Sequence, residues 1–219
     1  MFRQKALYPA RQPLCDFVTS YGNTTYSAAH SELSFPATSA PGDLCLVAAG
    51  NTDALDVTAP PGFAQIYQRN PYSSYKQALF WKHLGQADPG ANMGSWTNAR
   101  FYAYAIYRPN FEVASVEHTV VYQYGGTGNP AAATVDMSTL YPGELRAAFL
   151  QITSNYGSSV AQTGVAPDFT VNVNWNPYEG VFAMKLYLPW EAGGATTWDQ
   201  ADTTGARSNT TGALKFTLR

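Results

Sequence analysis

The stretch SAPGDLCLVAAG, residues 39–50, joins a Pro-Gly turn and one acidic residue to an unbroken apolar run. A second stretch of the same design, LYPGELRAAFLQ, occupies residues 140–151. An apolar run bounded by turn residues is typical of a buried β-strand. We therefore expect both segments to be core strands at equivalent places in two similar halves. The side chains predicted to be buried are Leu44, Leu46, Val47, Leu145, Phe149 and Leu150.

The two halves of the chain resemble one another beyond these turns. Segments of the first half recur in the second half in the same order, and the last strand-like segment of each half ends in Arg. We interpret the pattern as an ancestral duplication with quasi-repeats at residues 31–110 and 131–219. The matching pairs are VTAPPGF (57–63) with GVAPDF (164–169), ALFWKHLGQADPGANMGSW (78–96) with FAMKLYLPWEAGGATTW (182–198), and FYAYAIYR (101–108) with ALKFTLR (213–219).

Strand patterns dominate the rest of the sequence. FTVNVNW, residues 169–175, alternates apolar and polar residues, which predicts a half-buried strand. FYAYAIYR is apolar on both faces, which predicts a central strand covered on both sides. Helical patterns are short and poor, and Gly/Pro-rich turns separate the strands. The sequence therefore predicts an all-β fold, an antiparallel, jelly-roll-like β-sandwich built from two similar halves.

Two similar halves can form one pseudo-symmetric sandwich or two tandem sandwiches. Residues 113–124, between the halves, have the pattern of a strand and not of a flexible spacer. This favours one intertwined unit, and we place the β-sandwich domain at residues 17–219, preceded by an N-terminal arm at residues 1–16.

The composition limits the classes of partner. Hydrophobic residues make up 45% of the chain and charged residues 13%, which is not a disordered composition. The net charge is −2 and Lys and Arg are scattered, so we expect no nucleic-acid partner. No apolar run is long enough to span a membrane, so we expect no membrane partner. The first residues lack the apolar stretch of a secretory signal, so we expect synthesis in a cytoplasm without export.

No catalytic pattern stands out in the sequence. The three histidines, His30, His83 and His118, have no ligand-spaced partner, and the two cysteines form neither a disulfide framework nor a metal site. A Gly-x-Ser-x-Gly elbow is absent, and nothing selects a pair of carboxylates for glycoside hydrolysis. The sequence therefore predicts a protein that is not an enzyme and has no catalytic residues, no metal and no cofactor.

Two local patterns have a structural and a functional interpretation. GNTDALD, residues 50–56, could place Asn51, Asp53 and Asp56 around a calcium ion, but it lacks the EF-hand order, so we favour a plain polar turn. His118 falls on the apolar face of its predicted strand, so we expect it to pack in the core or at an interface and not to act as a base.

The order of the motifs resembles a β-sandwich domain family of bacteriophage virion structural proteins. The resemblance rests on Pro41-Gly42-Asp43-Leu44, on APPGF (59–63), on ALFWKHLGQA (78–87) and on the apolar strand that ends in Arg, and it covers residues 31–219. Phe63 stands where related domains have Trp. The resemblance implies a non-enzymatic component of a virion, made in the host cytoplasm, that packs on other virion proteins as a head-decoration or tail/fibre protein and forms a homo-oligomer.

Aromatic residues in turns are the candidate contacts for such a partner. Tyrosine on a loop offers a large, rigid contact surface to proteins and to sugars. The alternative function is therefore a carbohydrate-binding module that recognises host surface glycans, and the structural alternative is that the rings only cap the sandwich. The predicted contacts are Tyr72, Tyr75, Trp175 and Tyr178, and SYGNTTYS (20–27) adds Tyr21 and Tyr26.

The N-terminal arm, residues 1–16, is basic, apolar and outside the repeat. Pro9 and Pro13 disfavour a regular helix or a central strand there. A terminus with this many apolar side chains is not a typical solvated tail, so we expect it to dock on a neighbouring subunit. The docking residues are Phe2, Arg3, Lys5, Tyr8 and Arg11.

Overall fold

The structure is a computed structural model of the 219-residue chain. The residues described are 15–24, 29–30, 33–72, 75–124, 133–135, 144–154, 160–163, 167–175, 178–188, 191, 194–200 and 207–219. All regular elements within these ranges are β-strands, as predicted. The docking residues proposed in the arm lie outside them.

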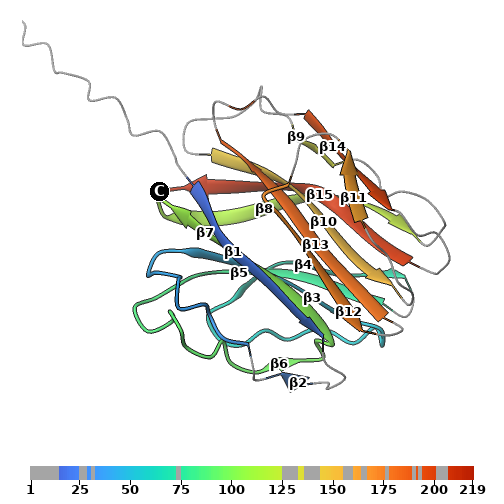
Figure 1. Ribbon diagram of the computed structural model, residues 1–219, viewed down its shortest axis with the longest axis horizontal. Helices are drawn as coiled ribbons and strands as arrows, with labels where there is room; N and C mark the ends of the chain where they lie inside the picture. The colour runs from blue at the N-terminus through green and yellow to red at the C-terminus, as the bar shows by residue number, and fades with distance from the viewer. Residues whose placement is uncertain are drawn as a thin grey trace, which may run out of the picture.

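Two five-stranded antiparallel sheets pack face to face (Figure 1). The first has the order β1-β7-β3-β5-β4 and the second has the order β8-β15-β10-β13-β12. The first sheet contains β1 (Cys15–Thr24), β3 (Leu44–Asn51), β4 (Ala64–Tyr72), β5 (Tyr75–His83) and β7 (Phe101–Pro109). The second contains β8 (Val113–Tyr124), β10 (Glu144–Ser154), β12 (Phe169–Trp175), β13 (Tyr178–Tyr187) and β15 (Arg207–Leu218).

Smaller strands lie on the outer sides of this pair of sheets, at the bottom and at the upper right of Figure 1. In the first half β2 (Ala29–His30) pairs with β6 (Trp96–Thr97), and Thr58 forms a bridge to Thr97 on the other side of β6. In the second half β9 (Ala133–Val135), β14 (Gly194–Gln200) and β11 (Val160–Thr163) form a sheet of the order β11-β14-β9.

The two halves repeat the same topology strand for strand. When each five-stranded sheet is followed from the first strand of its half, the strand order β1-β7-β3-β5-β4 of the first sheet corresponds to the order β8-β15-β10-β13-β12 of the second. The outer strands correspond as well, since β2, Thr58 and β6 occupy the chain positions of β9, β11 and β14. A large and a small sheet with these crossing connections make each half jelly-roll-like. The prediction of an antiparallel β-sandwich built from two similar halves is confirmed.

The two Pro-Gly-acid motifs precede the central strands of the two sheets, as predicted. β3 lies between β7 and β5, and β10 lies between β15 and β13. The six apolar side chains predicted to be buried in these strands are all at most 1% exposed. β3 is buried along its whole length, which is why its segment is apolar without alternation, whereas β10 carries Arg146 on its partly open outer face.

The acidic residue of each motif ties the start of the central strand to its neighbour. Asp43 is buried, and its carboxylate accepts two hydrogen bonds of 2.9 Å from the Arg108 guanidinium at the end of β7. The Ala40 amide also donates to Asp43, at 2.7 Å, which closes the turn. The counterpart, Glu144, lies 3.9 Å from Lys215 on β15. The acid therefore has a structural role in both halves.

One apolar core joins the two sheets. It includes Leu44 and Tyr107 from the first half and Phe149 and Phe216 from the second. The halves therefore share one core, but they are not intertwined as the sequence analysis expected, because each half supplies all the strands of its own sheet. The repeats are also longer than expected: β1 begins at Cys15, inside the arm predicted at 1–16, and β8 begins the second half at Val113.

The Phe101 ring packs against two glycines where the two sheets meet. Its ring lies against Gly50 of the neighbouring strand and against Gly180 of the opposite sheet. A Cβ at Gly180 would lie 2.8 Å from Phe101 Cδ2, closer than real Cβ contacts come. A side chain at Gly180 would therefore displace the ring and separate the sheets locally.

A buried polar network crosses the same interface. Gln77 of β5 is 0% exposed, and its Nε2 donates a hydrogen bond of 3.0 Å to Thr153 Oγ1 of β10. The Thr210 hydroxyl, from β15, donates to Gln77 Oε1. The Gln77 side-chain amide of the first half is thus hydrogen-bonded to two hydroxyl groups of the second half.

Gln151 makes the reciprocal contacts. It is 1% exposed on β10, and its Nε2 donates a hydrogen bond of 3.0 Å to the Ala49 carbonyl oxygen of β3. The Tyr67 hydroxyl, from β4, donates to Gln151 Oε1. Burial raises the pKa of Tyr67, so the hydroxyl stays protonated and remains a donor. Each buried amide therefore bonds groups of the opposite half.

Replacing Gln151 should destabilise the protein strongly. Gln151→Leu leaves the Tyr67 hydroxyl and the Ala49 carbonyl without their partner in an apolar layer, at a cost of about 2–5 kcal/mol. The control Gln65→Leu, at an exposed position of β4, should change stability by about 0.5 kcal/mol or less. Urea unfolding measures both, and equal effects would contradict the role of the network. Adding Tyr67→Phe to Gln151→Leu should recover part of the loss.

Candidate functional site

The two predicted aromatic turns lie at equivalent places in the two halves. Tyr72 pairs with Tyr75 at the closed end of the β4-β5 hairpin, and Trp175 pairs with Tyr178 at the closed end of the β12-β13 hairpin. The sequence analysis therefore selected the same hairpin twice. The side chains of Tyr72, Trp175 and Tyr178 lie outside the described part of the structure, so their role as contacts stays a prediction.

Tyr75 is not a surface contact. Its side chain is 1% exposed, because β5 continues to Tyr75 and packs it inside the protein. The prediction was wrong because NPYSSYK reads as one long turn, whereas the strands extend to Tyr72 on one side and begin again at Tyr75 on the other. Tyr75 is thus part of the core.

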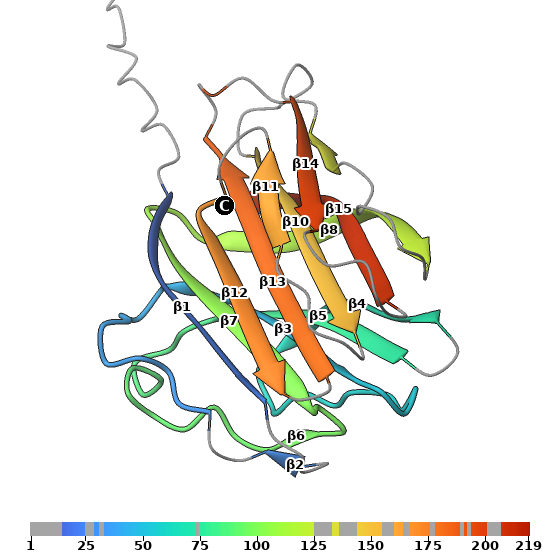
Figure 2. The same ribbon diagram turned by 45° about the vertical axis from the view of Figure 1, so that its right-hand side comes forward.

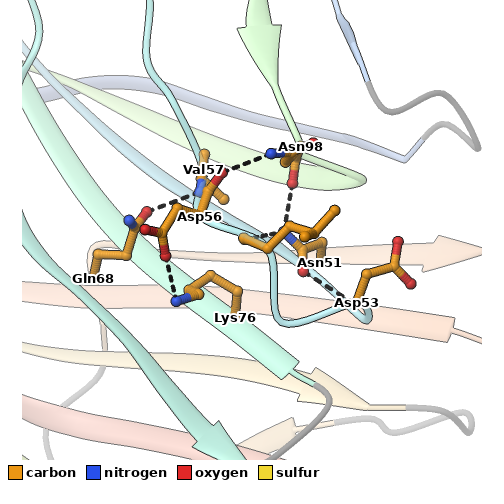
Figure 3. Close-up of polar contacts among 8 residues, drawn as sticks. Asn51, Asp53, Asp56, Val57, Gln68, Lys76 and Asn98 are labelled. Carbon is orange, nitrogen blue, oxygen red and sulfur yellow. Dashed lines mark hydrogen bonds and ion pairs between the residues drawn. The ribbon is translucent and has the colours of Figure 1, made fainter.

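The polar loop after β3 is organised by one buried asparagine (Figure 3). Asn51 Nδ2 donates hydrogen bonds to the carbonyl oxygens of Leu55 at 2.7 Å and Asn98 at 2.6 Å. Its Oδ1 accepts a hydrogen bond of 3.1 Å from the Asp53 amide. The side chain of Asn98 returns a hydrogen bond of 2.9 Å to the Asp56 carbonyl oxygen. Side chains therefore replace the ladder bonds that the backbone loses where β3 ends.

The carboxylates of this loop are already engaged by protein cations. Asp56 Oδ1 lies 2.5 Å from Lys76 Nζ, and Asp53 forms an ion pair with Arg100. Asn51 Oδ1 is occupied by the Asp53 amide. The three oxygen donors considered for calcium thus serve three different protein partners and do not converge on one point. This arrangement agrees with the favoured interpretation, a polar turn, and the described residues contain no cluster of metal-ligating side chains.

The histidines whose side chains are described have structural contacts. His83 Nε2 accepts a hydrogen bond of 2.8 Å from the Val113 amide, and its Nδ1 lies 3.2 Å from the Gly42 carbonyl oxygen. Because Nε2 is an acceptor here, Nδ1 carries the proton and donates to Gly42. The ring thereby joins the turn before β3 to the first residue of the second half.

His118 lies at the rim of the interface between the sheets and not in the core. Its ring packs against Tyr67 of β4, with centroids 5.7 Å apart, but the side chain is exposed. Loss of hydration and the nearby Arg69 guanidinium lower the pKa of His118 below its usual 6.5. Of the two expected placements, core or interface, the ring therefore has the second, and it stays exposed because β8 is an edge strand of its sheet and only one side of the ring is covered.

The cysteines are buried and unpaired. Burial and nearby acidic residues raise the pKa of Cys15 to about 12, and burial raises that of Cys45 further. A thiol that stays protonated is a poor nucleophile and a poor metal ligand. Both side chains therefore act as small apolar residues of the core.

An open pocket of about 240 Å³ lies on the outer face of the second sheet, over β8, β15 and β10. Its charged lining consists of Glu117, Arg146 and Lys215 among the residues that the structure describes. Lys215 Nζ lies 2.8 Å from Glu117, and Arg146 lies 3.5 Å from Glu144. The pocket thus presents paired charges of both signs, unlike the mostly apolar clefts that hold small molecules.

Strand β1 carries exposed aromatic side chains. Phe17 is 39% exposed and stacks on Phe169 of the second sheet, with centroids 5.6 Å apart. Tyr21 is 49% exposed and lies 5.7 Å from the ring of Tyr104. The sequence analysis singled out Tyr21 but missed Phe17. The register shift between Phe17 and Thr19 breaks the alternation of inward and outward side chains along β1, so the sequence pattern did not indicate that Phe17 is exposed.

Comparisons with protein-family models, with curated proteins and with solved structures gave no match. Among the residues that the structure describes, no helix of the length and apolar character needed to span a membrane is found. The fold and the surface of the chain itself are therefore the basis for a proposal about function.

Removing the Asn51 amide should destabilise the loop and the protein. Asn51→Ala leaves two carbonyl oxygens and one amide without their partner, at a cost of about 2–4 kcal/mol in unfolding free energy. Asn70→Ala, at an exposed position of β4, is the control and should cost about 0.5 kcal/mol or less. Thermal and urea unfolding measure both. If millimolar calcium raised the unfolding temperature of the wild type but not of Asn51→Ala, the polar-turn interpretation would fail.

The lowered pKa of His118 should make the fold less stable in mild acid. The imidazole of His118 binds a proton near pH 6.5 in the unfolded chain and only at lower pH in the folded chain. The free energy of unfolding is therefore unaffected by protonation of His118 above pH 6.5 and decreases as the pH falls below it. His118→Gln should lose less stability than the wild type between pH 7.5 and 5. Urea unfolding across this range and NMR titration of the ring test the prediction. A ring pKa in the folded protein at or above 6.5 would contradict it.

Proposed function

We propose that this protein is a non-enzymatic structural component of a bacteriophage particle, which packs on other virion subunits as a head-decoration or tail/fibre protein. The observation that carries the proposal is the architecture: two jelly-roll-like halves share one core and form a stack of sheets that presents strand edges and, on the second sheet, a charged outer surface. The jelly roll recurs in viral capsid proteins, and the order of turn and strand motifs resembles a virion family.

The contacts inside the protein support a scaffold role. Described carboxylates such as Asp43, Asp56 and Asp168 are engaged by Arg108, Lys76 and Lys185 in ion pairs that fix turns and strand ends. Phe101 and the two buried glutamines fix the two sheets relative to one another. A subunit that transmits contacts between neighbours needs this kind of rigidity.

The surface supports contact with proteins. Phe17 and Tyr21 expose aromatic area on an edge strand, and aromatic residues are enriched at protein interfaces. The outer face of the second sheet adds the paired charges around Arg146 and Lys215, which suit a polar partner surface. These features lie on different faces, so one subunit can contact more than one neighbour.

The proposal predicts that the chain is present in purified particles. Mass spectrometry of phage particles purified by density gradient should detect it in stoichiometric amounts. Deleting residues 1–14, which precede β1, should leave thermal unfolding unchanged but reduce incorporation sharply. A control substitution at exposed Gln65, on the edge of the first sheet opposite β1, should leave incorporation unchanged.

Two outcomes would contradict the proposal. One is a chain that is abundant in the lysate and absent from particles, especially if it is retained on a glycan array, which is the result expected of a carbohydrate-binding module. The other is hydrolysis of a polysaccharide or ester by the pure protein that a single His or Asp substitution abolishes.

A further inference from the structure

Strand β1 has an unpaired edge in the described sheets. It extends from Cys15 to Thr24 and pairs with β7 along its whole length, and it is the terminal strand of its sheet. Figure 2 shows β1, in dark blue, at the left-hand side of the two large sheets, beside β7 and β12. An edge strand presents backbone N–H and C=O groups on its open side, which are a template for another strand.

The two edges of the first sheet differ in their protection. The opposite edge, β4, contains Pro71 and Arg69, and its pairing with β5 has two register shifts. Proline, charged residues and irregular pairing are the features by which proteins block strand addition at an edge. β1 contains no proline and no basic residue, its charged residue, Asp16, lies at its start, and its pairing has one register shift. Of these two edges, β1 is therefore the one open to a further strand.

Aromatic rings flank this edge on both faces of the sheet. Phe17 faces the second sheet, where it stacks on Phe169, and Tyr21 faces the outer side, beside Tyr104. Each ring is half covered by its neighbours and half exposed. The side chains of an added strand would cover the exposed halves, because cross-strand neighbours approach to about 5 Å.

The chain supplies a segment of matching chemistry. Residues 2–8, FRQKALY, contain no proline or glycine and alternate Phe2, Gln4, Ala6 and Tyr8 with Arg3, Lys5 and Leu7. Residues 1–14 carry three basic residues and no acidic one, whereas β1 carries the exposed carboxylate of Asp16. An apolar and basic segment thus meets an edge with exposed aromatic rings and an acidic residue.

The segment between residues 2–8 and β1 disfavours pairing of these two stretches within one chain. Residues 9–14, PARQPL, would have to form the loop of a hairpin, yet they contain no Gly, Asn or Asp. Pro9 and Pro13 favour an extended conformation for themselves and for the residues before them. Hairpin loops depend on residues that adopt left-handed or tight-turn conformations. An extended connection would disfavour the return of residues 2–8 to the β1 of their own chain.

We propose that residues 2–8 of one copy add as a strand to the β1 edge of a second copy, and that two copies exchange these segments reciprocally. The backbone of the added strand supplies hydrogen bonds. Its side chains alternate between the two faces of the sheet, so one set covers Phe17 and the other covers Tyr21. The contact extends the five-stranded sheet of each copy by one strand. It is a self-association of the chain and does not depend on the proposed place in a particle.

A proline scan of the arm tests the donor side. Sedimentation velocity over a concentration series should show that the wild-type chain forms dimers. Ala6→Pro interrupts the proposed strand and should raise the dimer dissociation constant about tenfold or more, because proline removes a ladder donor and is excluded from regular strand pairing. The matched control Ala10→Pro, between the two existing prolines, should stay within about twofold of the wild type. Both variants leave residues 15–219 unchanged, so thermal unfolding of dilute protein should not change.

Substitution on β1 tests the acceptor side. Tyr21→Lys places a charge beside the open edge and should weaken the dimer about as much as Ala6→Pro, whereas Tyr21→Phe should preserve it. A wild-type chain that stays monomeric at high concentration would overturn the proposal. A dimer that is insensitive to both Ala6→Pro and Tyr21→Lys would overturn it as well. Neither result would bear on whether the chain is found in particles, because that experiment detects the protein and not its dimer.

Discussion

The reciprocal burial of two amides, Gln77 and Gln151, holds together an interface that hydrophobic burial alone would leave ambiguous. The two sheets have the same strand order and similar apolar inner faces, so each inner face resembles the surface that covers it. Apolar contacts are non-directional and would tolerate sliding of one sheet on the other. The hydrogen bonds from Gln77 to Thr153 and from Gln151 to Ala49 tolerate much less, because a buried amide without its partner is costly. They select one alignment of the two sheets.

The network also distinguishes the two similar halves. The chain position of Gln151 in the second half corresponds to Gly50 in the first, since both follow the Pro-Gly-acid motif by the same number of residues. Gly50 accommodates the ring of Phe101, whereas Gln151 carries an amide across the interface. The two halves are therefore complementary through different residues at one equivalent position. Divergence at this interface favours pairing of a first half with a second half over pairing of like halves.

The outer faces of the two sheets also differ, because the one is packed and the other is a polar surface. Cys45 and Ile106 pair across β3 and β7 and are buried under the segments that cover the first sheet. Their counterparts in the second sheet, Arg146 and Lys215, pair across β10 and β15 and line an open charged pocket. The same register position thus serves as core in one half and as surface in the other. This difference identifies the outer face of the second half as the place where a function can be added without loss of the fold.

The fold was predictable because strand signals and the repeat are local features of the sequence. The Pro-Gly-acid turns and the apolar runs after them predicted both central strands and the burial of residues such as Leu44 and Phe149. β1 was not predicted as a strand, because its register shift at Phe17 interrupts the period of two. The roles of Asp53 and Asp56 were not predictable, because their cations, Arg100 just before β7 and Lys76 on β5, come close only in the folded sheet. The position of His118 depended on the sheet order, which no local pattern encodes.

The same reasoning explains why the candidate contacts gave mixed results. Tyr75 and Tyr21 both lie in sequences rich in turn residues, yet one ring is buried and the other is exposed. β5 is an interior strand, with β3 and β4 on its two sides, whereas β1 is terminal and covered on one side only. The exposure of an aromatic residue in this protein therefore depends on the place of its strand in the sheet more than on the polarity of its neighbours in sequence. The β1 edge keeps aromatic rings exposed and contains no proline, whereas β4 carries Pro71 and Arg69, so β1 is the edge of the first sheet better suited to a partner strand.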